Sequence, residues 1–109
     1  MRAALLAGGW LVAAAIVFLS LTPNPPELDL EQGDKLGHLL SYGVLSLWFC
    51  LLYRGWQVRL GFAALWVGMG IALEFAQGAT GYRTFEFADM AANSLGVLLG
   101  WGISATLRR

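Results

Sequence analysis

Nine polar side chains in this otherwise apolar chain have the types and spacings needed for chemistry. They are Asp34, Lys35, His38, Glu74, Gln77, Arg83, Glu86, Asp89 and Asn93. Carboxylates beside a histidine can move protons, because free imidazole has a pKa of about 6.5, and the same groups can bind a polar ligand. An ionisable side chain at the centre of a membrane helix costs about 2.5 to 3.5 kcal/mol, so several in one short chain indicate a functional site.

Four of these residues form two pairs with helical spacing. Glu74 and Gln77 are three residues apart and Asp89 and Asn93 are four apart, so each pair shares one face of a helix. The two amides are equally well explained as hydrogen-bonding groups that hold helices together. A carboxylate several residues inside a span faces a wet cavity or a cation, which favours a functional interpretation of Glu74.

The other candidates also have a structural interpretation beside the functional one. Asp34 stands near the start of a predicted helix and could cap its free N–H groups. Lys35 could simply extend its ammonium group to the interface. Arg83 could pair with Glu86, Asp89 or Glu74, or could clamp a phosphate or carboxylate of a ligand. His38 by itself is as consistent with an interfacial histidine as with a proton carrier.

The elements that must position these residues are membrane-spanning helices. Of the 109 residues, 58% are hydrophobic and 13% are charged, whereas a soluble domain has about 25% charged residues. The length suits a single domain, residues 1–109. Seven basic and seven acidic residues give a net charge of zero, so no nucleic acid partner is expected. Cys50 is the only cysteine, which excludes an internal disulfide.

Four apolar runs, at about residues 3–21, 36–53, 60–79 and 87–107, predict four transmembrane helices in a compact all-α bundle. The first run has nineteen residues, and at about 1.5 Å per residue it crosses a hydrocarbon core of roughly 30 Å. A cleaved signal peptide is the alternative for this run. Because no Ala-x-Ala site follows it, we expect the run to be retained as a helix.

Basic residues predict the orientation of the bundle. Lys35 and Arg83 are expected on one side of the membrane and five arginines on the other: Arg2, Arg54, Arg59, Arg108 and Arg109. The side richer in Lys and Arg is usually cytoplasmic, so both termini are expected there. All nine candidates then lie near the extracytoplasmic mouth of the bundle. No charged or amide side chain is expected on the inner half of any span.

The order of motifs along the chain resembles that of the VanZ-like family of small bacterial membrane proteins. The motifs are Ser20-Leu21-Thr22-Pro23, Asp34-Lys35-Leu36-Gly37-His38 with Tyr42-Gly43, Glu74-x-x-Gln77, and Arg83-x-x-Glu86-x-x-Asp89-x-x-x-Asn93-x-x-Gly96. The resemblance covers nearly the whole chain and implies a multi-pass protein of the bacterial inner (cytoplasmic) membrane. The family is named for a member associated with resistance to the glycopeptide antibiotic teicoplanin, and its biochemical activity is not established. Resistance does not follow for this chain from the resemblance alone.

The leading hypothesis from the sequence is a non-enzymatic envelope protein. Its polar pocket would bind a polar or lipid-linked envelope ligand, such as a cell-wall precursor. Among the charged candidates two are positive and four are negative, so an amine-bearing, zwitterionic or peptide-like ligand fits better than a strongly anionic one. Apart from the lipid bilayer and this ligand, the sequence names no partner, and it leaves a homo-oligomer open.

The alternative is a membrane-embedded enzyme acting on a lipid-linked or cell-wall substrate. Glu74 or Asp89 would be the general base and His38 the acid, or these three residues would hold a divalent metal. The single histidine excludes a two-histidine, one-carboxylate iron site, and no Gly-x-Ser-x-Gly or phosphate-binding glycine-rich loop occurs. We therefore expect no metal and no cofactor, and place the enzyme second. Proton or ion passage ranks third.

Overall fold

A computed structural model describes residues 1–23, 33–82 and 86–107, and only the backbone of Gly33 and Asp34. These ranges contain four helices and no strand: α1 (Arg2–Leu21), α2 (Gly33–Leu52), α3 (Trp56–Ala79) and α4 (Phe87–Leu107). Each helix is long and apolar enough to cross a membrane. The predicted all-α, multi-pass membrane architecture with four spans is confirmed.

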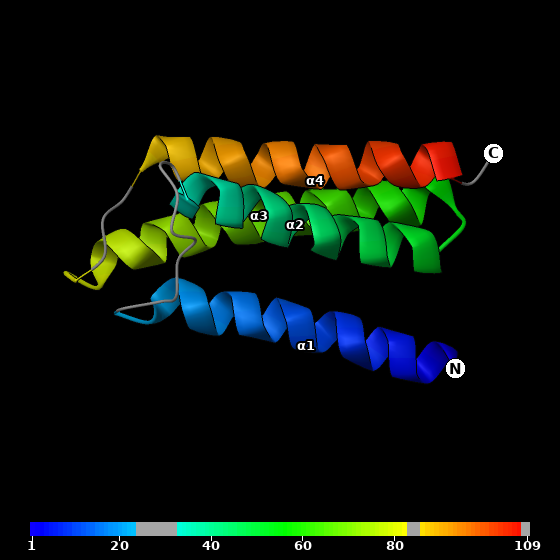
Figure 1. Cartoon of the computed structure of the whole chain (residues 1–109), viewed down its shortest axis with the longest axis horizontal. Coiled ribbons are helices and arrows are strands. Elements are labelled where there is room, and N and C mark those ends of the chain that lie inside the picture. The colour runs from blue at the N-terminus through cyan, green and yellow to red at the C-terminus, as the bar shows by residue number, and fades with distance from the viewer. Residues whose placement is uncertain (24–32, 83–85, 108–109) are drawn as a thin grey trace.

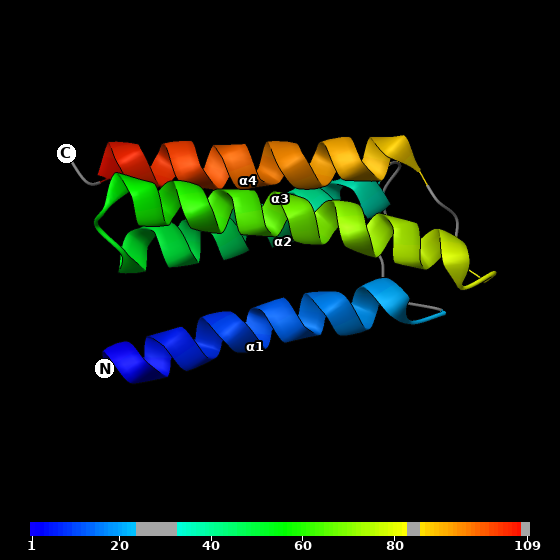
Figure 2. The same cartoon turned by 180° about the vertical axis from the view of Figure 1, so that it is seen from behind.

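The four helices lie side by side with alternating directions (Figures 1 and 2). Within the described ranges, α2, α3 and α4 pack on one another, and α1 packs on α2 and α3 only, on the side away from α4. The helices α1 and α3 begin at the same end at which α2 and α4 end. We call this end the terminal end, and the opposite end, at Leu21, Gly33, Ala79 and Phe87, the polar end.

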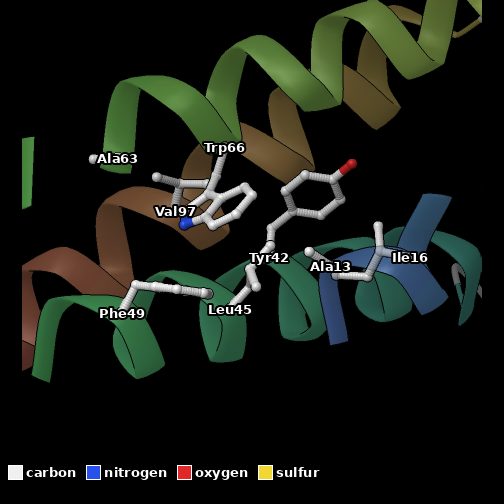
Figure 3. Packing of buried hydrophobic residues seen from close by; sticks show 8 residues of the cluster. All are labelled: Ala13, Ile16, Tyr42, Leu45, Phe49, Ala63, Trp66 and Val97. Carbon is white, nitrogen blue, oxygen red and sulfur yellow. The ribbon is translucent and has the colours of Figure 1, made fainter. Parts of the chain in front are cut away.

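The middle of the bundle is an apolar core formed by all four helices (Figure 3). Trp66 of α3 is 2% exposed and its ring centroid lies 5.2 Å from that of Phe49 on α2. Tyr42 and Leu45 extend the core along α2 toward the polar end. Because lipid tails are as apolar as these side chains, close packing rather than exclusion of water holds such helices together. Packing in the core therefore sets how each helix is rotated toward its neighbours, including at the two ends of the bundle.

Glycines bring α2 and α4 into backbone contact. A side chain at Gly96 would collide with the carbonyl oxygen of Leu39, and one at Gly100 would collide with the carbonyl oxygen of Gly43. Beside this contact, Ser46 Oγ donates a 2.8 Å hydrogen bond to the carbonyl oxygen of Val97. The expectation that the Gly96-x-x-x-Gly100 pattern permits close helix approach is confirmed. It also brings the polar residues at the start of α4 next to those at the start of α2.

Two helix boundaries differ from those predicted. The helix α3 begins at Trp56 instead of residue 60, after the extended N-cap residue Gly55, whose carbonyl oxygen accepts a 3.0 Å hydrogen bond from the N–H of Arg59. Arg59 is therefore inside the helix and buried, so the expectation of no charged side chain in that half of the spans is wrong. Hydropathy ends a run at a charged residue, whereas the backbone continues the helix because arginine is a good helix former. Likewise α2 begins at Gly33, so Lys35 belongs to its first turn.

Candidate functional site

Six of the nine candidate side chains meet at the polar end of the bundle. Their positions follow from helical spacing: Lys35 and His38 are three residues apart on α2, and Asp89 and Asn93 are four apart on α4. Glu74 enters from the last part of α3, and Glu86 immediately precedes α4. We call these six residues the polar cluster: Lys35, His38, Glu74, Glu86, Asp89 and Asn93.

Lys35 lies between two carboxylates of the α4 segment. Its ammonium donates a hydrogen bond to Glu86 Oε2 at 2.6 Å and lies 2.8 Å from Asp89 Oδ1. Both contacts are ion pairs, so Lys35 holds the two carboxylates together. The interpretation that Lys35 merely extends to the interface is wrong, because its ammonium is held inside the cluster.

His38 joins α2 to both polar residues of α4. Its Nδ1 lies 2.8 Å from Asn93 Oδ1, and since an amide oxygen only accepts, Nδ1 carries the proton of this hydrogen bond. The other ring nitrogen, Nε2, lies 3.7 Å from Asp89 Oδ2. Asn93 itself packs on α3 at Gly70, where a side chain would come within 3.0 Å of its Nδ2. His38 is thus held so that Nε2, where a second proton binds, faces a carboxylate.

Glu74 is the most deeply buried carboxylate of the cluster, with 1% of its surface exposed. Its Oε2 accepts a 2.7 Å hydrogen bond from the backbone N–H of Glu86, at the start of α4. The N-terminal end of a helix carries partial positive charge, which stabilises a nearby carboxylate. Glu74 was expected to face a cation or a wet cavity, and among the described residues its hydrogen-bond donor is the backbone N–H of Glu86.

Gln77 lies one turn from Glu74 but contacts α1 instead of the cluster. Its Nε2 donates a 2.8 Å hydrogen bond to the carbonyl oxygen of Ser20, and the hydroxyl of Tyr82 donates one of 2.7 Å to that of Leu21. These carbonyl groups belong to the last turn of α1, where no helical N–H is available to them. Gln77 therefore ties α1 to α3, which is its structural interpretation.

Two predicted site residues cannot be placed by their side chains. The backbone of Asp34 lies in the first turn of α2, and its side chain lies outside the described residues. Arg83 lies outside them entirely, and so do its expected pairs with Glu86, Asp89 and Glu74.

The cluster has an excess of negative charge and no metal-binding geometry. Lys35 contributes one positive charge against three negative charges from Glu74, Glu86 and Asp89. Within the described ranges, no three His, Cys, Asp or Glu side chains are grouped closely enough to hold a metal ion. The geometry therefore does not support the metal-binding form of the enzyme hypothesis. What the cluster can do is accept hydrogen bonds from a cationic group.

Sequence reasoning missed Arg59 and Ser104 at the terminal end. Arg59 Nη2 donates a 2.6 Å hydrogen bond to Ser104 Oγ on α4, and both residues are buried. Trp56 and Val58 lie before Arg59 and are themselves apolar, so the sequence contained a signal that the third helix begins before Arg59.

Comparisons with known proteins agree with the motifs and the fold. A family model described as VanZ/LLP1 matches residues 7–108. The chain is also similar to the uncharacterized protein C11E3.10 of Schizosaccharomyces pombe, with 34% identity over 77 residues. This alignment covers 68% of the chain and 48% of the yeast protein, so the chain spans about half the length of that relative. No solved structure matches the chain. The motif order, the four apolar helices and the family match together show that this chain belongs to the VanZ/LLP1 family.

Proposed function

We propose that this chain is an envelope membrane protein whose polar cluster binds the headgroup of a polar or lipid-linked ligand. The observation that supports it is the meeting of six polar side chains from three helices at one end of an apolar bundle. Glu74 and Asp89 are buried, whereas the side chains of Lys35 and Glu86 are 21% and 42% exposed. A ligand would enter past these two partly exposed residues.

The ligand class follows from the charge of the cluster. The cluster has three carboxylates and one ammonium, that of Lys35, which lies 2.6 Å from Glu86 Oε2 and 2.8 Å from Asp89 Oδ1. One ammonium cannot neutralise three carboxylates, and a nearby positive charge stabilises a carboxylate. A ligand ammonium group would supply both a donor and positive charge. An amine-bearing or zwitterionic headgroup is therefore the proposed ligand.

The orientation and location belong to the same proposal. Arg2, Arg54 and Arg59 lie at the terminal end and Lys35 at the polar end, so the bias of basic residues favours a cytoplasmic terminal end. The polar cluster would then face the outside of a bacterial inner membrane. Reporter fusions after Leu21 and Leu52 should report outside and inside respectively.

A link to teicoplanin resistance rests on the family name, and it would be tested by glycopeptide susceptibility of cells lacking the protein.

Thermal unfolding of the purified full-length protein in maltoside micelles tests the ligand class. Phosphatidylethanolamine, whose amine can donate hydrogen bonds, should raise the midpoint temperature more than phosphatidylcholine, whose quaternary amine cannot. Asp89→Asn and Glu74→Gln should reduce this difference, since each removes one negative charge from the cluster. Ser41→Ala is the control, because Ser41 lies on α2 one turn from His38, is exposed, and donates its hydrogen bond to the carbonyl oxygen of Gly37 in its own helix. Equal responses to the two lipids, or an unchanged difference in both cluster variants, would reject the proposal.

One observation favours the second candidate, an acid–base enzyme acting on a lipid-linked substrate. His38 is fixed by Asn93 and presents Nε2 toward Asp89 at 3.7 Å, which resembles the positioning of a catalytic imidazole by a third group. Incubation with lipid-linked cell-wall precursors should then give a product that His38→Ala does not form. If the intact protein leaves these precursors unchanged, the enzyme hypothesis loses its support.

A further inference from the structure

Arg59 is a buried cation at the terminal end, far from the polar cluster. It lies in the first turn of α3 and is 9% exposed. Its Nη2 donates to Ser104 Oγ at 2.6 Å, and Ser104 Oγ in turn donates to the carbonyl oxygen of Trp101 at 2.6 Å. Its Nε is buried and has no hydrogen-bond partner. Of the five N–H groups of the guanidinium, one bonds Ser104 in the described part of the chain, and the others remain for a further acceptor.

No side-chain carboxylate in the described part of the chain lies near Arg59. The described carboxylates, those of Glu74, Glu86 and Asp89, all belong to the polar end. The sequence has no Asp or Glu in residues 1–26, 35–73 or 90–109, which include every helix segment at the terminal end. An arginine side chain remains protonated in proteins. No described side chain of opposite charge therefore compensates it, which leaves room for an anionic group from outside the chain.

The neighbouring arginines make this end still more positive. Arg2 Nη1 donates a 2.6 Å hydrogen bond to the carbonyl oxygen of Leu52, and its guanidinium lies 4.8 Å from the ring centre of Tyr53. Arg54 is exposed in the link between α2 and α3. Basic residues next to a membrane attract anionic lipids, and the effect adds with each residue. The counter-charge for Arg59 is therefore expected among the lipid headgroups.

Arg59 is close enough to the end of α3 to reach a lipid phosphate. The 24 residues of α3 give a helix about 36 Å long, which exceeds a hydrocarbon core of roughly 30 Å. The backbone of its first turn is therefore expected near the edge of that core. A guanidinium presents its N–H groups as a planar fork that fits phosphate oxygens, and its long side chain can move the charge toward the interface.

We propose that Arg59 binds the phosphate group of an anionic phospholipid in the leaflet at the terminal end, with Ser104 holding one side of its guanidinium. The N–H groups of Nη1 and Nη2 that do not bond Ser104 donate to the phosphate oxygens. The site is independent of the proposed headgroup site, because the two lie at opposite ends of the bundle.

The test is thermal unfolding of the purified full-length protein in phosphate-free maltoside micelles, with phosphatidylglycerol, phosphatidylcholine or inorganic phosphate added. Phosphatidylglycerol should raise the midpoint of the unaltered protein by several degrees. Arg59→Gln should abolish this rise and, without added phosphate, should unfold at a temperature equal to or above that of the unaltered protein, because an unpaired buried charge is gone. Arg54→Gln, which removes an exposed arginine at the same end, is the matched control and should retain the rise.

Each result decides between the sources of the counter-charge. A rise with inorganic phosphate equal to that with phosphatidylglycerol supports a phosphate site and assigns it to free phosphate. Equal losses in Arg59→Gln and Arg54→Gln overturn the proposal in favour of general surface attraction. If Arg59→Gln does not fold, Arg59→Lys decides, because lysine keeps the charge without the planar fork. The phosphatidylglycerol concentration that gives half of the rise in midpoint temperature should be several-fold higher for Arg59→Lys than for the unaltered protein. An equal concentration for the two proteins would overturn the proposal.

Discussion

His38 Nδ1 lies 2.8 Å from Asn93 Oδ1, and this hydrogen bond joins α2 to α4 in the polar cluster. The two residues are 55 positions apart in the chain, yet both were predicted as candidates from their spacing to other polar residues. Their contact places a proton-binding side chain between an amide and a carboxylate. His38 belongs to the family motif on α2 and Asn93 to the one on α4, so this hydrogen bond links the two motifs.

The His38–Asn93 hydrogen bond should appear as a coupling between the two residues. In a double-mutant cycle of His38→Ala and Asn93→Ala, the coupling free energy should be about 0.6 kcal/mol and at most about 1.7 kcal/mol, as for other hydrogen bonds between membrane helices. The measurement is unfolding of the purified protein by sodium dodecyl sulfate in mixed micelles. Strictly additive effects would show that the hydrogen bond contributes nothing to stability.

Lys35→Met should destabilise the protein by about 1 to 3 kcal/mol. This lies between the value for an exposed ion pair and that for breaking a buried one, because the Asp89 side chain is only 8% exposed while that of Glu86 is 42% exposed. Adding Asp89→Asn to Lys35→Met should restore part of the loss, since it removes a carboxylate left without its cation. Arg54→Met, which removes an exposed cation, is the control and should change the unfolding free energy little. A double variant less stable than Lys35→Met would contradict the ion-pair interpretation.

The glycines between α2 and α4 should not tolerate alanine. Gly96→Ala and Gly100→Ala each place a methyl group against backbone of α2, and overpacking of this kind costs about 1 to 3 kcal/mol or more. Gly61→Ala and Gly102→Ala are controls, because a methyl group at either position meets no atom within 4 Å. These controls should be neutral or slightly stabilising, as alanine favours the helix over glycine. Unfolding midpoints of the four variants should therefore separate into two groups.

Gln77→Leu should loosen the end of α1 without unfolding the bundle. The change removes the donor to the Ser20 carbonyl oxygen, one of the two side-chain hydrogen bonds described here that join the α1 end to the α3 end. Hydrogen–deuterium exchange of residues 19–22 should become faster, and that of α4 should not change. Tyr82→Phe is the companion variant, because it removes the other hydrogen bond, to the Leu21 carbonyl oxygen, from a more exposed position. Unchanged exchange in both variants would show that packing alone holds this end of α1.

The number of helices and the end at which polar residues gather were predictable because both depend on local sequence. A run of about twenty apolar residues must be helical in lipid, since no water is there to satisfy its backbone groups. Residues at the ends of consecutive helices also alternate between the two sides, which places Lys35, Glu74 and Asp89 at the same end without knowledge of packing.

The choice of partner was decided only by the tertiary structure. Lys35 pairs with both Glu86 and Asp89, and Gln77 donates to α1 while Glu74, one turn away, accepts from the start of α4. Such choices depend on how far each helix is rotated and how closely two helices approach. Here Gly96 and Gly100 set that approach through steric contacts with α2.

The sequence by itself thus determined a four-span bundle of the VanZ type with one polar end, because hydrophobicity and spacing act along the chain. Only the tertiary structure showed that six of the nine candidates contact one another across three helices, and that Arg59 is buried beside Ser104. The physical reason is that hydrogen bonds and ion pairs act over about 3 Å, a distance fixed by helix packing and by backbone capping at Gly55 rather than by hydropathy.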